Sequence, residues 1–149
     1  MAIKANFNID ELFKDVYAKV EDITDAVIQA IIAACTQTVA KARMLDTYKD
    51  RTTLLRSSIG YVVYDHGQKL VENFQGAGGT SSGEGVAKGR QVAEDAAKTY
   101  PSAIVAVIVA GADYALYVES KGYDVITGHC NELNKLLEQY LREAVASFQ

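Results

Sequence analysis

The residue types of a serine hydrolase occur in this chain in the order that many hydrolases use. Gly79–Gly83 reads Gly-Thr-Ser-Ser-Gly, which matches the G-x-S-x-G pattern that places a serine, here Ser81, on a tight turn between strand and helix. Asp113 or Asp124 and then His129 follow Ser81 along the chain. The nearest predicted strand ends several residues earlier, however, and the flanking glycines favour a loop that would hold a nucleophile loosely. We therefore interpret the segment as a solvated loop, and a small serine hydrolase is the alternative.

The same segment also has some features of a phosphate-binding loop. Gly83, Gly85 and Gly89 lie at the start of a predicted helix, where backbone N–H groups can cradle phosphate oxygens. The Gly-Lys-Ser/Thr ending that supplies a lysine and a hydroxyl is missing, and so is the glycine spacing of dinucleotide-binding turns. These absences favour the solvated loop, and nucleotide binding is the second alternative to it.

The residues able to bind a metal are scattered along the sequence. His129 and Cys130 are adjacent, so their side chains diverge on a helix, while His66 and Cys35 belong to other predicted elements. The two cysteines lie in apolar or helix-start contexts, which is typical of reduced thiols that act as small hydrophobes. Acidic pairs along the predicted helices are typical of solvated surfaces. We predict no catalytic site, no metal site and no cofactor, and therefore no enzyme.

The composition is that of one globular domain spanning residues 1–149. The chain has 49% hydrophobic and 23% charged residues, one proline and a formal net charge of −4, which disfavours a grip on nucleic-acid phosphates. Met1–Asn6 lacks the basic stretch and apolar run of a signal peptide, so we expect no export. The longest strongly apolar run, Ala103–Ala112, is about half of the ~20 residues that a membrane-spanning helix requires. We therefore expect no membrane partner.

The first predicted element is a long amphipathic helix from Asn8 to about Met44. Asn8, with Glu11 three residues later, imitates a capping box that satisfies free backbone N–H groups. Because so long and uniform a pattern usually breaks, we expect a kink or gap at Asp22–Thr24. The residues of one helical face recur every three or four positions: Leu12, Phe13, Val16, Val20, Ile23, Val27, Ile31, Ala34 and Thr38.

A hairpin and a second helix follow. Ser58–Tyr64 is rich in tyrosine and valine and predicts a strand, and Lys69–Phe74 predicts its hairpin partner after a turn that contains glycine. The glycine-rich Gln75–Gly85 is expected to be a mobile loop, because its composition can bury little. Val86–Thr99 predicts an alanine-rich amphipathic helix that Pro101 ends.

The last third of the chain predicts a strand, an ambiguous segment and a final helix. Ala103–Ala110 is β-branched and apolar throughout, which predicts a central buried strand. Gly111–Asp124 fits both a helical turn and extended structure. Thr127 is expected to cap the final amphipathic helix. The fold class is therefore α+β: a long N-terminal helix, a small mostly antiparallel sheet with a β-hairpin, flanking helices and a C-terminal amphipathic helix.

Tyrosine is abundant, with nine residues in the chain and no tryptophan. Tyr114 and Tyr117 lie close together in the sequence Tyr-Ala-Leu-Tyr-Val-Glu. Amphipathic rings of this kind are enriched at protein interfaces, but they also cover sheets within one subunit. Both interpretations stay open on the residues alone.

Two segments resemble the tail-completion, or head-to-tail joining, family of long-tailed bacteriophages. Asp50–Ile59, which reads Asp-Arg-Thr-Thr-Leu-Leu-Arg-Ser-Ser-Ile, is similar to that family's Asp-x-Thr-Gly-x-Leu-x-x-Ser-Ile stretch. Ala110–Glu119 followed by Gly122 is similar to its second stretch, Tyr-Ala-x-Tyr-Val-Glu near a glycine. Thr53 stands where the family usually has glycine. Because glycine adopts positive φ far more readily than threonine, this difference argues against a positive-φ turn there. The residues after Gly122 also differ from the family's commoner Gly-Thr ending.

The resemblance implies a structural protein that forms or joins a ring between the tail tube and the capsid connector. Such a ring joins two different patches of neighbouring subunits. The matched motifs suggest Tyr114, Tyr117 and Glu119 for one patch, with Arg51 and Arg56 forming or bracing the other.

The resemblance also implies partners and a location. The partners would be further copies of the chain and other tail or connector proteins, with DNA at most passing through the ring and no small-molecule substrate. The location would be the bacterial host cytoplasm during assembly and then the virion. Another neck role, stopper or adaptor, is the nearest alternative. The Gln75–Gly85 loop would become ordered on meeting a neighbour.

Overall fold

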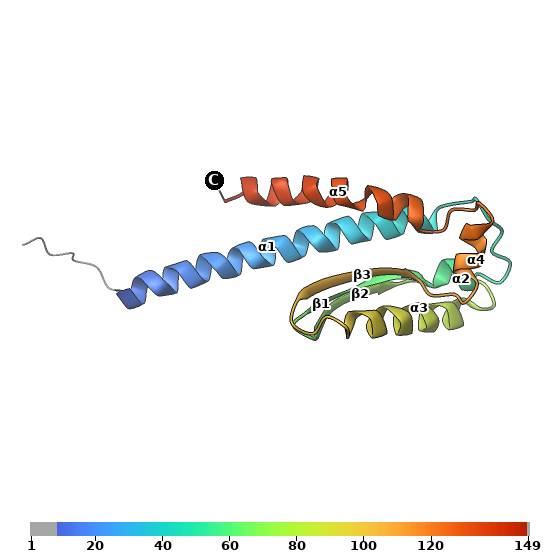
Figure 1. Cartoon of the computed structure of the whole chain (residues 1–149), viewed down its shortest axis with the longest axis horizontal. Coiled ribbons are helices and arrows are strands. Elements are labelled where there is room, and N and C mark those ends of the chain that lie inside the picture. The colour runs from blue at the N-terminus through green and yellow to red at the C-terminus, as the bar shows by residue number, and fades with distance from the viewer. Residues whose placement is uncertain (1–8, 149) are drawn as a thin grey trace, which may run out of the picture.

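The computed structural model describes residues 9–148, which form a stack of layers (Figure 1). The C-terminal helix α5 (Thr127–Ala146) lies antiparallel on the long helix α1 (Ile9–Arg43). Below α1 comes a three-stranded sheet, and α3 (Ser82–Ala97) covers the sheet's other face. The predicted α+β fold is confirmed, and the structure adds the short helices α2 (Leu54–Ser57) and α4 (Ala115–Ser120).

Helix α1 runs without interruption through the position at which we predicted a kink. The prediction at Asp22–Thr24 is wrong because nothing there breaks the helix: the segment has neither proline nor glycine. The Thr24 hydroxyl donates to the carbonyl oxygen of Val20 at 2.8 Å, so its polar group is satisfied within the helix. The predicted cap at Asn8 lies outside the described residues.

Among the described residues, one helical segment is long and apolar enough to cross a membrane by length and composition alone. That segment is Phe13–Arg43, within α1, and 33% of its most apolar stretch is buried in the fold. Core helices of soluble proteins have the same length and composition, so this property is weak evidence for a membrane. The apolar run Ala103–Ala112, by contrast, is about half of the ~20 residues that such a helix requires.

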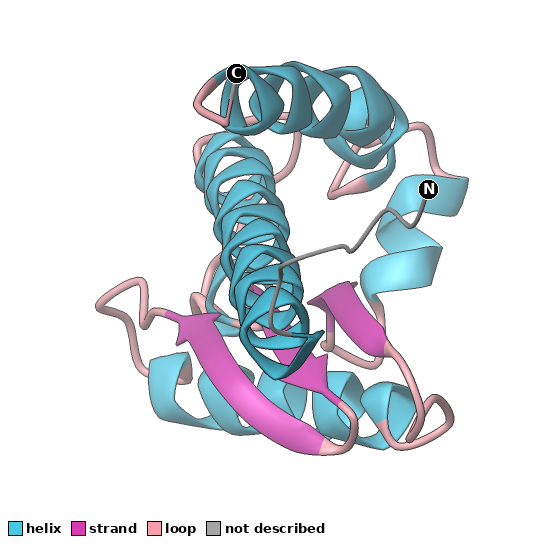
Figure 2. Cartoon of the chain, turned by 90° about the vertical axis from the view of Figure 1, so that its left-hand side faces the viewer, coloured by secondary structure: helices cyan, strands magenta, loops and turns pink. Residues whose placement is uncertain are grey.

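The sheet has the order β2-β1-β3, with both pairings antiparallel. The strands are β1 (Ile59–Asp65), β2 (Gln68–Phe74) and β3 (Ile104–Ala110), and they lie between helices on both faces (Figure 2). The predicted hairpin is confirmed, and its turn has φ of 48° at His66 and 83° at Gly67. Two successive left-handed residues give the twist that a two-residue hairpin needs.

The strand predicted to be central is in fact at an edge of the sheet. β1 is the central strand, and its first five residues are buried because α1 and α3 cover its two faces. β3 pairs with β1 from Ile59↔Ala110 to Asp65↔Ile104, and no strand within residues 9–148 pairs with its outer side. The unbroken apolar run therefore predicted a strand correctly. It did not predict the strand's place in the sheet, because an edge strand that is only partly buried, as β3 is, can carry the same apolar residues.

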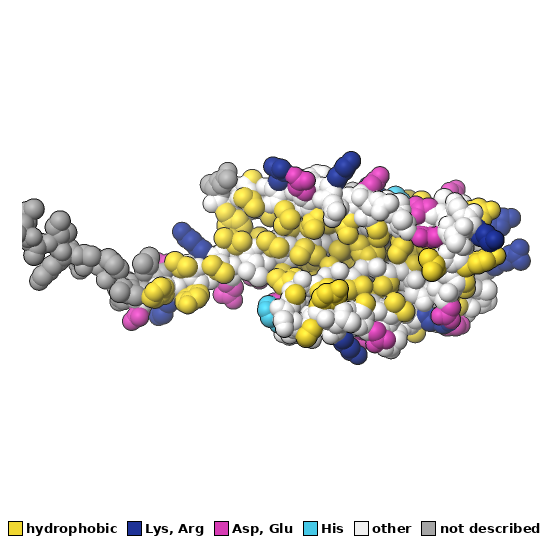
Figure 3. All heavy atoms as spheres, viewed as in Figure 1, with side chains coloured by type: hydrophobic (Ala, Val, Ile, Leu, Met, Phe, Trp, Pro, Cys, Tyr) yellow, Lys and Arg dark blue, Asp and Glu magenta, His cyan; other side chains and the backbone are white. Residues whose placement is uncertain are grey.

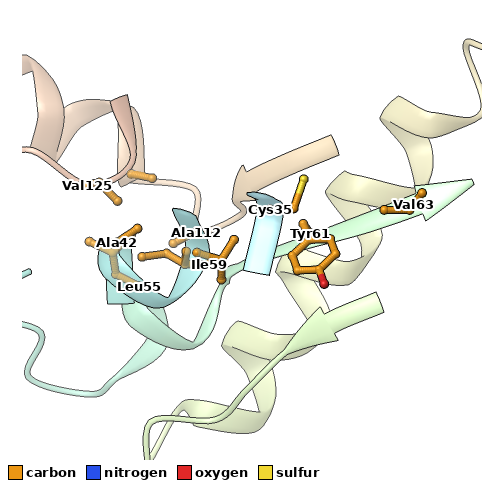
Figure 4. Packing of buried hydrophobic residues seen from close by; sticks show 10 residues of the cluster. Cys35, Ala42, Leu55, Ile59, Tyr61, Val63, Ala112 and Val125 are labelled. Atoms are coloured by element: carbon orange, nitrogen blue, oxygen red, sulfur yellow. The ribbon is translucent and has the colours of Figure 1, made fainter. Parts of the chain in front are cut away.

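The core has two parts, one on each face of β1. Tyr61 and Val63 pack toward α1, and Tyr61 lies beside Cys35 of that helix (Figure 4). The Tyr61 hydroxyl shares a 2.6 Å hydrogen bond with Thr36, also of α1. Val62 packs toward α3, against Ala93 and Ala97. Because successive side chains of β1 point to opposite faces of the sheet, β1 packs against helices on both faces.

Candidate subunit interface

The two segments that carry the sequence resemblance lie against each other. The backbone carbonyl of Ser58 accepts the N–H of Gly111 at 3.0 Å, and the Ser58 hydroxyl accepts the N–H of Ala112 at 3.0 Å. Partial burial raises the pKa of the Tyr114 phenol, while Leu55 and Thr52 of the first segment act on that pKa in the opposite direction. The segments, far apart in sequence, therefore form one continuous piece of structure at the end of the sheet.

The turn before α2 has the positive φ that a glycine would provide, although Thr53 occupies it. Thr53 has φ of 61°, a conformation that costs an ordinary residue about 1–2 kcal/mol. Its hydroxyl lies 2.7 Å from that of Ser82 and accepts the N–H of Gly79 at 3.0 Å. Asp50 accepts the backbone N–H of Arg56 at 2.8 Å and closes the turn. These hydrogen bonds hold the strained residue in place.

The two arginines of this segment have different surroundings. The guanidinium of Arg56 lies 5.3 Å from the ring centroid of Tyr48 and donates to the backbone carbonyl of Arg43, at the end of α1. Arg56 therefore braces the turn against α1. Arg51 is exposed, so of the two it is the one placed to meet another molecule.

An exposed aromatic patch surrounds α4, and we call it the α4 surface. Its members are Tyr114, Leu116, Tyr117 and Tyr123, exposed by 41%, 80%, 63% and 51% respectively. Tyr117 and Tyr123 line a groove of about 520 Å³, and the Lys121 ammonium lies 5.3 Å from the Tyr117 ring centroid. Concave aromatic surface of this kind is typical of protein contacts.

Glu119 does not belong to the α4 surface, because its carboxylate caps α5. The carboxylate accepts the backbone N–H groups of Val125, Ile126 and Thr127 at 3.2, 2.8 and 3.0 Å, as well as the Thr127 hydroxyl. The prediction that Thr127 caps α5 is therefore wrong: Thr127 is its first residue, and its hydroxyl donates to Glu119. Partial burial would raise the pKa of Glu119, but the Thr127 hydroxyl and the backbone donors outweigh it and lower the pKa.

Replacing Glu119 by glutamine is expected to destabilise the protein by about 1–2 kcal/mol at pH 7, the cost of losing a charged helix cap. Because the folded pKa of Glu119 lies below its usual value of 4.5, this stabilisation is complete above that value and is lost as pH falls through the folded pKa. Urea denaturation of both proteins between pH 3 and pH 7 checks it. A difference between the two that is constant over this range would contradict the assignment.

The candidate hydrolase residues are not brought together. Ser81 precedes α3, below the sheet, and its N–H donates to the carbonyl of Thr52 at 2.9 Å. His129 lies on α5, in the opposite outer layer. Asp113 pairs with Lys88 at 2.6 Å, and Asp124 accepts the N–H of a residue in the first turn of α5.

The glycine-rich segment is shorter than predicted, because α3 begins at Ser82 and includes Gly83 and Gly85. The remaining loop is tied down at Ala77, whose N–H donates to the Ser57 hydroxyl at 2.9 Å, and at Gly79. The mobility of residues 75–85 stays a prediction, and these hydrogen bonds favour an ordered segment.

Gly85 and Gly89 have a packing role that the sequence analysis missed. A Cβ on Gly85 would lie 2.3 Å from the carbonyl oxygen of Leu54, and one on Gly89 would lie 2.4 Å from that of Ser58. With Ala93 and Ala97 they form a buried row of small residues at four-residue spacing. That spacing was the available signal, since it places all four on one helical face.

Arg43 is a second residue that the sequence analysis missed. Its guanidinium donates to the carbonyl oxygen of Ile59 at 3.1 and 2.9 Å, and to the backbone and side-chain oxygens of Asn73 at 3.0 Å each. Burial lowers the pKa of this guanidinium. Arg43 thus links α1 to β1 and β2. No sequence motif predicts such a role.

The thiols are poor nucleophiles. Burial and the neighbouring Cys130 raise the pKa of Cys35 to about 11, and burial foremost raises that of Cys130. Within residues 9–148 no group of three histidine, cysteine or acidic residues is arranged to hold a metal ion.

Comparison with protein-family models, curated proteins and solved structures finds no match to this chain.

Proposed function

We propose that the chain is a structural assembly subunit that forms or joins a ring at the head-to-tail junction of a long-tailed phage. The α4 surface carries the proposal. Three tyrosines and a leucine on one short helix and its flanks remain 41–80% exposed in the described fold. A large exposed aromatic patch is a common mark of a contact surface.

Two further observations support the phage assignment. The left-handed conformation at Thr53 matches the glycine that the related pattern has at this position. The hydrogen bonds between Ser58 and the residues before α4 join the two motifs, so both help to position the α4 surface. The proposed partners are further copies of the chain and tail or connector proteins, and stopper or adaptor stays the alternative role.

Replacing Tyr117 by alanine is expected to weaken self-association and tail joining at least tenfold, because an exposed ring at the centre of the patch is lost. The stability of the isolated subunit should change by less than about 0.5 kcal/mol, as for other surface positions. Light scattering after size exclusion, an in vitro tail-joining assay and thermal melting measure the three quantities.

Tyr100→Ala is the matched control, since Tyr100 is 60% exposed but lies beyond α3, away from α4. It should leave association and joining unchanged. Equal effects of both substitutions, or unfolding by Tyr117→Ala, would show that the α4 surface is not a specific contact.

A further inference from the structure

Helix α1 extends well beyond the end of α5 and stands alone (Figure 1). From Asp10 to Asp22 every side chain that the structure describes is exposed. An isolated helix of this length is marginally stable in water, and most helices are held by packing of an apolar face. We call residues 10–22 the overhang.

The overhang has an apolar stripe that no element within residues 9–148 covers and that Ile23 continues toward α5. Phe13, Val16, Val20 and Ile23 repeat at alternating spacings of three and four residues, the pattern of a helix that packs lengthwise on another helix. Together with Tyr17 these side chains are 47–70% exposed. The exposed stripe therefore has the spacing of the contact face between two paired helices.

The stripe continues into an apolar cavity between α1 and the end of α5. The cavity has a volume of about 100 Å³ and is lined by Ile23 and Val27 of α1 and by Leu141, Val145 and Phe148 from the C-terminal end of the chain. Leu141 and Val145 also line a larger groove on α5, of about 540 Å³, together with Leu137 and the charged Glu138 and Arg142. Space-filling atoms show apolar side chains gathered along this face (Figure 3).

Helix α5 is only half covered. It packs mainly against α1, and none of its residues is buried although its apolar stripe is broad. A helix with a wide apolar face and one neighbour can accept a second helix beside it. Its groove is therefore an acceptor for a stripe like that of the overhang.

The charge of the overhang disfavours a lipid surface as its partner. Residues 10–25 contain six acidic residues and two lysines, a formal net charge of −4. Helices that lie on anionic membranes have a basic polar face, the opposite of this one. A protein surface is the better match.

We propose that the overhang of one copy packs into the α5 groove of a second copy. The exposed apolar residues of the stripe and of the end of α5 offer roughly 700 Å² per copy, close to the ~800 Å² per partner of a stable interface. The stripe and the end of α5 meet at one cavity, so two copies related by a two-fold axis can each give a stripe and receive one, and both patches of each copy are buried in the same contact. The inference rests on the proposed function in that it names one contact of the assembly.

Two exposed valines test the two patches separately. Val20→Glu damages the donor and Val145→Glu damages the acceptor, and both side chains are 54% exposed, so the subunit should still fold. Ala18→Glu adds the same charge to the other face of the overhang and is the control. Each valine variant alone should self-associate at least tenfold more weakly than the wild type in sedimentation experiments, with unchanged circular dichroism, and the control should match the wild type.

Mixing the two valine variants gives the decisive result. One intact donor and one intact acceptor remain, so a 1:1 complex is expected. Two variants that stay monomeric when mixed, or a Val20→Glu protein that assembles like the wild type, would overturn the inference. So would a monomeric wild type whose overhang binds phosphatidylglycerol vesicles. Tail joining that depends on Tyr117 but not on Val20 would remove this contact and leave the proposed function standing.

Discussion

Replacing Gly89 by alanine is expected to lower the free energy of unfolding by about 3 kcal/mol, a large share of the ~5–15 kcal/mol of a typical domain. The new Cβ would lie 2.4 Å from the carbonyl oxygen of Ser58 and 2.7 Å from Cε1 of Phe74. The Ser58 oxygen also accepts the N–H of Gly111, so it cannot move without disturbing the start of β1. Chemical denaturation followed by circular dichroism measures the loss.

Gly83→Ala is the matched control within the same helix. A Cβ at Gly83 meets nothing within 4 Å, so the substitution should instead stabilise the protein by about 0.5–1 kcal/mol through helix propensity. The two variants make the same chemical change and are expected to differ in sign. If Gly89→Ala proved as stable as Gly83→Ala, the close approach of α3 to the sheet would be wrong.

Replacing Arg43 by alanine is expected to cost about 3–5 kcal/mol. The substitution removes the guanidinium donors to the backbone oxygens of Ile59 and Asn73, and it removes the side chain that ties α1 to two strands. Urea denaturation gives the loss in stability, and hydrogen exchange should show its largest increase where α1 meets the sheet.

Lys41→Ala is the control for Arg43, because Lys41 is exposed in the same turn of α1 and should change stability by less than about 0.5 kcal/mol. Arg43→Lys should recover only part of the loss, since an ammonium cannot reproduce the fork of donors that spans both strands. A fully stable Arg43→Lys protein would argue that charge, not geometry, holds this corner.

The elements with strong periodicity were predictable from the sequence. The apolar spacing gave α1 and α5, and alternation with a glycine turn gave the hairpin, because these signals are local. The position of β3 was not predictable in the same way. Its apolar run indicates burial, but β1 is the central strand because β2 and β3 pair with its two edges, and that order depends on segments distant in sequence.

The residues of the candidate interface were likewise predictable from the sequence only in part. Tyr117 and Tyr114 are exposed, as an interface would require, but the exposure of Tyr117 depends on α4, whose sequence also fits extended structure. Glu119 looked like a third interface residue because it follows them directly. It turns inward since the chain folds back at Gly122 and brings the start of α5 within reach of its carboxylate, and no local pattern reports that return.

The layered arrangement has a consequence for how this subunit opens. Helix α5 depends on α1 and on the Glu119 cap, whereas β1, β2, β3 and α3 bind one another directly. We therefore expect two cooperative units, in which fluctuations release α5 at a lower free energy than is needed to melt the sheet. A neighbour that grips α5 would suppress those openings first, so assembly would tighten the outer unit of the fold while leaving the inner one as it was.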